Sequence, residues 1–267
     1  MSSREAVHRM VVSADIKDSG RQGRRARLRS RAGMYDIFGL AFDAVGVTGG
    51  QLHLEDRGDG LLAAVAPEVP PTALVGLWLE EVHQGLREHN AGLRDPLRLR
   101  VAMHAGPVTD DGRGLVGRAV DLTCRLCDSE PARAVLAAAD DVDLVFVVSD
   151  HLYRTVVAEG GRFVEPEHYR PRQVRLKETD ETAWFHVPRR SEPPLPEPAV
   201  RRVVAAVPED GERPAPRPAP RATPTKYWIT VNGGPNQVVD GAEVHGDIVG
   251  VRLPREDEGG ARGGGRG

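Results

Sequence analysis

Two acidic segments carry the residue types best suited to chemistry in this chain of 267 residues. One covers residues 11–17, with the sequence VVSADIK, and the other covers residues 55–60, with the sequence EDRGDG. Each pattern predicts a strand that delivers an aspartate to its end or to the next turn, and these aspartates are Asp15 and Asp59. Two carboxylates placed in this way can hold hard divalent cations against the phosphates of a nucleotide. The structural alternative is that Asp15 caps a strand and that Asp59 occupies a Gly-Asp-Gly turn, where aspartate is common.

Three further segments continue the series of motifs. They are residues 97–108 (LRLRVAMHAGPV), 117–126 (GRAVDLTCRL) and 174–185 (VRLKETDETAWF). In this order and at these spacings the chain resembles the class III nucleotide cyclases, the family of adenylyl and guanylyl cyclases. The resemblance spans roughly residues 8–188.

The resemblance implies a reaction and a metal site. The family converts a nucleoside triphosphate into a 3′,5′-cyclic nucleotide, and Mg²⁺ or Mn²⁺ would be held by Asp15, Asp59 and the backbone carbonyl of Ile16. The ions would favour attack of the ribose 3′-hydroxyl on the α-phosphate and neutralise the departing pyrophosphate. The resemblance also implies a homodimer, because each active site of the family combines the metal aspartates of one subunit with an Asn/Arg pair of the other.

The remaining catalytic positions depart in part from the family pattern. Arg125 matches an arginine that contacts the α-phosphate, but the asparagine four residues earlier is Asp121 in this chain, and an anion there should weaken binding or catalysis. Lys177 matches a lysine that holds the terminal phosphates, and Glu178 follows it where a glycine is usual. The alternatives are that Arg125 is solvated or paired with Asp121, and that Lys177 is a surface lysine.

The choice of base is indicated by two positions. Glu55 stands where guanylyl cyclases have a glutamate, and the partner position is Gly114, which has no side chain. Guanine is therefore favoured over adenine. Because some relatives make cyclic pyrimidine nucleotides, a pyrimidine base is also an alternative. The departures at Asp121, Glu178 and Gly114 also support an alternative function, a catalytically weakened nucleotide-binding module. His104 is expected to have a structural role.

Hydrophobic periodicity predicts the elements that must position these residues. Helices are predicted over residues 21–45, 72–90 and 118–129 and after Asp150, and strands over 10–15, 51–55, 61–65, 98–104, 144–148 and a final pair. The predicted apolar stripes of the first two helices are Met34, Ile37, Phe38, Ala41 and Phe42, and Leu74, Leu77, Trp78, Val82 and Leu86. Strand, helix, hairpin, helix and strand is the ferredoxin-like order, so the expected fold class is an α/β (α+β) sandwich with a ferredoxin-like core of the cyclase type.

Composition excludes several classes of protein. A hydrophobic content of 40% allows a buried core, and a net charge of −3 without a dense basic block argues against a nucleic-acid partner. No apolar run reaches the roughly 20 residues of a membrane span, and no signal peptide is recognisable, so we expect a cytoplasmic protein. Cys124 and Cys127 lack a second ligand pair and are expected to be packing residues. The abundance of Arg, Ala and Gly is typical of actinobacterial proteins.

The character of the chain changes after residue 188. Eleven of the 21 prolines fall between residues 188 and 224, a composition that predicts an extended linker. We expect a cyclase-type domain over residues 1–188, a disordered Pro-rich linker over 189–224, a β-prone motif over 225–253 and a disordered Gly/Arg-rich end over 254–267. The β-prone motif contains NQVVDG and VHGDIVG, and it resembles amyloid signalling motifs of bacterial immune effectors. That resemblance implies a protein partner with a similar motif and a role in signalling or antiphage immunity; a lone hairpin or a disordered tail is the alternative.

Overall fold

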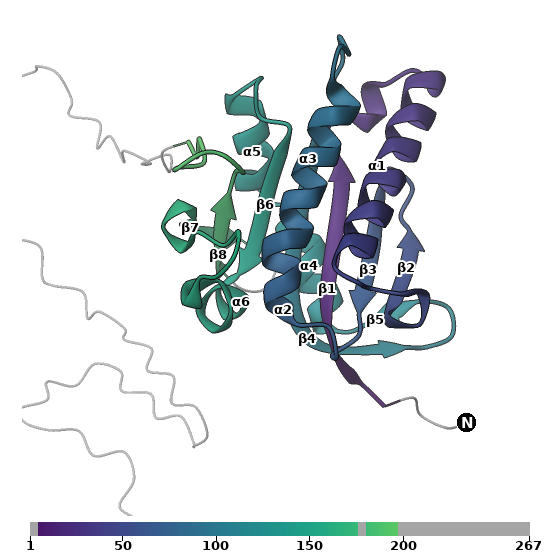
Figure 1. The fold of residues 1–267 in the computed structure, drawn as a ribbon, viewed down its shortest axis with the longest axis vertical. Coiled ribbons are helices and arrows are strands. Elements are labelled where there is room, and N and C mark those ends of the chain that lie inside the picture. The colour runs from purple at the N-terminus through teal and green to yellow at the C-terminus, as the bar shows by residue number, and fades with distance from the viewer. Residues whose placement is uncertain (1–4, 176–179, 197–267) are drawn as a thin grey trace, which may run out of the picture. The chain divides into compact units, whose positions relative to one another are not determined.

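In the computed structural model, which describes residues 5–175 and 180–196, one β-sheet carries helices on both of its faces (Figure 1). The described strands are β1 (Val7–Ile16), β2 (Leu52–Asp56), β3 (Gly60–Val65), β4 (Leu99–Asp110), β5 (Leu115–Val116), β6 (Leu144–Ser149), β7 (Arg170–Arg175) and β8 (Asp180–His186). The described α-helices are α1 (Arg24–Ala44), α2 (Pro71–Ala73), α3 (Leu79–Asn90), α4 (Arg118–Cys127), α5 (Glu130–Ala138) and α6 (Asp150–Thr155).

The strand order confirms the predicted fold class. The described strands run β2-β3-β1-β4-β6-β8-β7, with β5 paired to β4. Only β4 and β6 pair in parallel, and the other neighbours are antiparallel. The sequence β1-α1-β2-β3-α3-β4 with the sheet order β2-β3-β1-β4 is the ferredoxin-like arrangement. β1 is therefore an interior strand of the sheet, between β3 and β4.

The alternation of β1 divides its side chains between two hydrophobic clusters. Met10, Val12, Ala14 and Ile16 pack with the buried faces of α1 and α3, which lie side by side over one face of the sheet (Figure 1). Val11 packs with buried residues of α4 on the opposite face. Because side chains alternate along a strand, Asp15 belongs with Val11 and therefore faces the α4 side.

Two of the predicted helices differ from the observed ones: one is interrupted and the other ends earlier than predicted. The helix predicted over residues 72–90 consists of α2, a π-helical stretch from Leu74 to Trp78, and α3. The predicted apolar residues of this segment are buried except for Leu77, which is half-buried. The helix predicted to reach residue 129 ends at Cys127, because Pro131 has no N–H to continue it and the Ser129 hydroxyl caps α5 instead.

Some predictions concern residues beyond the described ranges. Lys177, Glu178, most of the predicted Pro-rich linker and the whole β-prone motif lie outside the residues that the structure describes. Within the described residues, no helix combines the length and the apolar character that a bilayer span requires.

Candidate functional site

Asp15 stands near the end of the central strand, between partners on both sides. It is opposite Gly60 of β3 and Arg100 of β4. The Arg100 guanidinium donates a hydrogen bond to Oδ2 of Asp15, whose side chain is 24% exposed. Burial raises the pKa of Asp15, the charge of Arg100 opposes this rise, and the negative charge of Asp59 adds to it. The two predicted carboxylates are thus close enough to influence each other.

Asp59 is held at the same end of the sheet by the β2–β3 turn. Gly58 has a φ of 80°, and a Cβ at Gly60 would collide with the carbonyl oxygen of Ala14, so both glycines are required for this turn. The amide of Ile16 donates to the carbonyl oxygen of Asp59 at 3.1 Å. The Ser19 hydroxyl donates to the Asp59 carboxylate. The turn is therefore attached directly to the end of β1.

The chemical types of the ligands at this end of the sheet suit a hard cation. Asp15 and Asp59 offer carboxylate oxygens and Ile16 a backbone carbonyl, which are the ligands that Mg²⁺ and Mn²⁺ prefer. The described residues contain no group of three or more His, Cys, Asp or Glu side chains arranged to hold a metal ion. A cation here would rest on two carboxylates, a backbone oxygen and groups supplied by a substrate or water.

Arg100 is the residue of this site that sequence reasoning missed. Its side chain is 10% exposed, its Nη2 pairs with Asp15, and its Nε is buried without a hydrogen-bond partner within the described chain. The signal in the sequence is the alternation of residues 97–101, which places arginine on a sheet face that must be covered by helices. A charge at such a position needs a buried partner.

Asp121 and Arg125 lie on α4, the helix that packs on the sheet face to which Asp15 belongs. Both are exposed on α4, and within the described residues no ion pair joins them to each other or to either aspartate. The inner face of α4 packs on the sheet, where the Cys127 thiol donates to the carbonyl oxygen of Arg100 at 3.4 Å. One chain therefore presents the Asp121 and Arg125 side chains outward.

Glu55 and Gly114, the two positions predicted to select the base, are neighbours in space. A Cβ at Gly114 would lie 3.1 Å from Oε1 of Glu55. The Glu55 carboxylate already accepts hydrogen bonds from the Leu115 amide at 2.5 Å and from Arg57 at 2.7 Å. His53 Nε2 lies 3.1 Å from the same carboxylate. A base at this position would have to share or replace these contacts.

The remaining candidates have packing contacts. His104 Nδ1 lies 2.7 Å from the Ser149 hydroxyl, and burial lowers the pKa of His104 to about 4. Cys124 and Cys127 are free thiols, and burial raises the pKa of Cys127 to about 12. These contacts agree with the structural roles expected for His104 and the cysteines.

Comparison with known proteins bears on the fold. No protein-family profile and no curated protein matches the chain. Among solved structures, an adenylate/guanylate cyclase/hydrolase from Silicibacter pomeroyi has a TM-score of 0.51 and 17% identity, and the match covers 69% of this chain and 98% of that one. The chain has the adenylyl and guanylyl cyclase fold.

Other cyclase structures match at lower TM-scores. The catalytic core of a rhodopsin-guanylyl cyclase in complex with ATPαS has a TM-score of 0.48 and 18% identity, covering 70% of this chain and 99% of that one. The adenylyl cyclase CyaB from P. aeruginosa has a TM-score of 0.48 and 15% identity, covering 71% of this chain and 98% of that one.

Proposed function

We propose that the protein is a nucleotide cyclase that forms a 3′,5′-cyclic nucleotide from a nucleoside triphosphate. The observation that supports this function best is the meeting of Asp15 and Asp59 at one end of a cyclase-type sheet, where the Ile16 amide fixes the turn that carries Asp59. Asp15 and Asp59 lie 44 positions apart in the sequence, and the fold brings them together to act on one ligand.

The proposed roles of the side chains follow from their positions. Asp15, Asp59 and the Ile16 carbonyl would hold Mg²⁺ or Mn²⁺, which when bound supplies charge that acidifies the 3′-hydroxyl and neutralises the phosphates. Arg100 balances the charge of Asp15 and adds positive charge beside the phosphates. Arg125, with Asp121 beside it, would approach the α-phosphate from a second subunit, and Lys177 would hold the terminal phosphates.

The activity test uses the purified full chain with each of the four nucleoside triphosphates and Mn²⁺. We expect a cyclic product, and we expect Asp59→Ala to abolish it. Asp36→Ala is the matched control, because Asp36 is an exposed aspartate of α1. If no triphosphate yields product, or if the two variants are equally active, the proposal is wrong.

The dimer has its own test, because the proposed site takes Asp59 from one subunit and Arg125 from the other. Asp59→Ala and Arg125→Ala should each be inactive alone. In a random mixture half of the dimers contain one of each, and each mixed dimer has one intact site of two, so about a quarter of the wild-type activity should return. A mixture that stays inactive while dimers exchange would exclude this shared site.

Guanine is the base that we propose for the substrate. Glu55 can accept hydrogen bonds from guanine, and Gly114 lies directly against its carboxylate without a side chain of its own. Arg57 would have to move aside, since it occupies one oxygen of Glu55. We expect GTP to be used faster than ATP, and Glu55→Gln to reduce this preference; equal rates with both substrates would contradict this assignment.

The second candidate is a nucleotide-binding signalling module with little turnover. It is favoured by the engagement of Glu55 with groups of its own chain and by the aspartate at position 121. Calorimetric titration of triphosphate and Mn²⁺, with product analysis of the same sample, separates the two functions. Binding without product would favour the module, and binding that Asp15→Ala leaves unchanged would exclude the proposed site in both versions.

We further propose that the β-prone motif recruits a partner with a similar motif, in bacterial signalling or antiphage immunity. The support is the sequence resemblance of residues 225–253 alone. Assembly through a long linker would raise the local concentration of the cyclase-type domains and favour their pairing.

A further inference from the structure

A cavity of about 670 Å³ lies between the beginning of α1 and the loop that joins α3 to β4. Five cationic residues line it, together with two aspartates, Asp18 and Asp95. The five are Lys17, Arg21, Arg29, Arg94 and Arg98. Its volume is within the range of small-molecule sites.

Three of these cationic residues form no ion pair within the described part of the chain. Arg21, Arg29 and Arg94 are exposed, and within the described residues none of them has an ion pair or a side-chain hydrogen bond. Like charges gathered in one concavity repel each other, and they also focus the field that attracts an anion. The unpaired arginines therefore favour a negatively charged ligand.

The side chains of the other two cationic residues, Lys17 and Arg98, bond to backbone carbonyls of residues that do not line the cavity. Arg98 donates from Nε to the Val142 carbonyl and from Nη2 to the Leu136 carbonyl, both at 2.7 Å. Lys17 Nζ donates to the same Leu136 carbonyl at 3.1 Å. Lys17 also pairs with Asp18 at 3.9 Å, and Nη1 of Arg98 lies 3.8 Å from the Asp140 carboxylate.

The beginning of α1 adds donors to the wall of the cavity. Gly23, which lines the cavity, is the N-cap residue of this 21-residue helix and provides no side-chain cap. The first amides of α1 are therefore free of a side-chain cap, and the helix dipole adds partial positive charge. Gln22 Oε1 is buried without a hydrogen-bond partner in the described chain, so a ligand hydroxyl could donate to it.

The walls are preorganised by contacts between α1, α3 and β4. The imidazole of His89 lies against Gly33, where a Cβ would collide with the ring. The Asn90 side chain donates to the Leu97 carbonyl at 2.8 Å and accepts from the Leu97 amide at 2.7 Å. These bonds close the loop that carries Arg94, so the site exists before a ligand binds.

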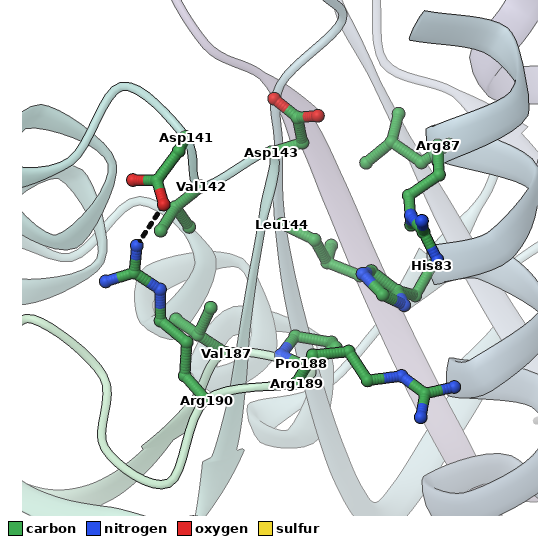
Figure 2. Close-up of a pocket in the computed structure, with 11 residues that line it drawn as sticks. His83, Arg87, Asp141, Val142, Asp143, Leu144, Val187, Pro188, Arg189 and Arg190 are labelled. Carbon is green, nitrogen blue, oxygen red and sulfur yellow. Dashed lines mark hydrogen bonds and ion pairs between the residues drawn. The ribbon is translucent and has the colours of Figure 1, made fainter. Parts of the chain in front are cut away.

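A second cavity of similar size, about 660 Å³, provides a contrast. Figure 2 shows Arg190 joined to Asp141 beside it, at 2.5 Å, and Arg189 pairs with Glu80. The charges of these two arginines are thus balanced by the protein. Arg87, the third arginine of this cavity, has no ion pair within the described residues but donates to Gln84 at 3.3 Å. Arg21, Arg29 and Arg94 differ because, within the described residues, they have neither an ion pair nor a side-chain hydrogen bond.

We propose that the cavity lined by Arg21, Arg29 and Arg94 binds a small phosphate-bearing anion, at a site separate from the Asp15 and Asp59 pair. Guanidinium groups bind phosphate through paired, charge-assisted hydrogen bonds, and three of them around one cavity suit a ligand with more than one negative charge. The site would let such a compound act on the protein independently of the proposed substrate.

The test is isothermal titration of the full chain with inorganic pyrophosphate in EDTA, so that no divalent cation is present. We expect Arg29→Glu and Arg94→Glu each to weaken binding about tenfold or more. Arg25→Glu is the matched control, because it makes the same charge change on the exposed surface of α1 outside the cavity lining, and it should change the affinity less than about threefold. Arg94→Gln is a milder variant than Arg94→Glu, because it removes the charge of this exposed loop residue without reversing it.

The outcomes separate this proposal from the proposed catalysis. Asp59→Ala should bind pyrophosphate as the wild type does, whether or not the protein forms cyclic nucleotides. The proposal is overturned if the wild type does not bind pyrophosphate, if Arg25→Glu weakens binding as much as the cavity variants, or if Asp59→Ala abolishes binding.

Discussion

The buried guanidinium of Arg100 donates a hydrogen bond to the carboxylate of Asp15 from the neighbouring strand. This pair places a positive charge where the proposed cation would bind, so Asp15 has a partner before any ion arrives. A cation must then share Asp15 with Arg100, which should weaken its binding relative to an unpaired carboxylate.

Arg100→Met is expected to lower the free energy of unfolding by about 2 kcal/mol at pH 7, because it leaves Asp15 partly buried without a counter-charge. Adding Asp15→Asn should recover most of this loss. Urea unfolding measures both effects. Arg175→Met is the control, since Arg175 pairs with Asp180 on the surface and has no contact with this pair, and it should cost less than about 0.5 kcal/mol. Equal losses for the two arginine variants would contradict the importance of the buried pair.

His104 should make the fold sensitive to acid. Burial lowers its pKa from 6.5 to about 4, so between these values the unfolded chain binds a proton that the folded chain excludes. The stabilisation is complete above pH 6.5 and is lost as the pH falls towards 4. Between pH 7.5 and 4.5 the free energy of unfolding should fall less for His104→Asn than for the wild type. The difference between the two losses should be at most about 3 kcal/mol. Unfolding curves with the same pH dependence for both proteins would show that His104 does not titrate in this way.

The two cysteines should differ in reactivity. Cys127 is buried with a pKa raised to about 12, whereas Cys124 is half-buried with a smaller rise. A thiol reagent at pH 8 should modify one cysteine per native chain and two after denaturation, because the thiolate is the reactive form. Native Cys124→Ser should not react. Rapid labelling of that variant would mean that α4 opens easily.

Limited proteolysis tests the predicted linker and locates the end of the domain. Arg189 and Arg190 pair with Glu80 and Asp141, and Leu195 packs against a hydrophobic cluster. Trypsin should therefore cut first beyond residue 196, within the Pro-rich stretch, and mass spectrometry should find a core that retains residues 189–195. A core ending at Arg189 or Arg190 would show that these contacts are weak, and resistance of the whole stretch would refute the linker.

The β-prone motif makes a prediction that does not depend on the described residues. A peptide of residues 225–255 should form thioflavin-positive fibres with a cross-β spacing of ~4.7 Å. Replacing Val238 and Val249 by aspartate should prevent assembly, because each would place a charge in the stacked core. A peptide that stays monomeric at high concentration, even with seeds of related motifs, would leave the motif without this role.

The amino-acid sequence by itself determined the order of most elements, though not α5 or β5, and the positions of the two proposed metal-binding carboxylates. Apolar spacing is a local property, so the buried stripe of α1 and the strand ends at Asp15 and Asp59 could be predicted from it. Helix ends were less predictable, because the break after Cys127 depends on how Ser129 and Pro131 compete with helical hydrogen bonding.

Only the tertiary structure decided which side chains share a site. Arg100 meets Asp15 across 85 residues, and the Leu115 amide reaches Glu55 across 60 residues. The gathering of Arg21, Arg29 and Arg94 likewise needs α1 to lie beside the loop before β4. Sequence periodicity defines the face on which a residue lies, but the partner on that face depends on strand pairing and helix packing between distant segments.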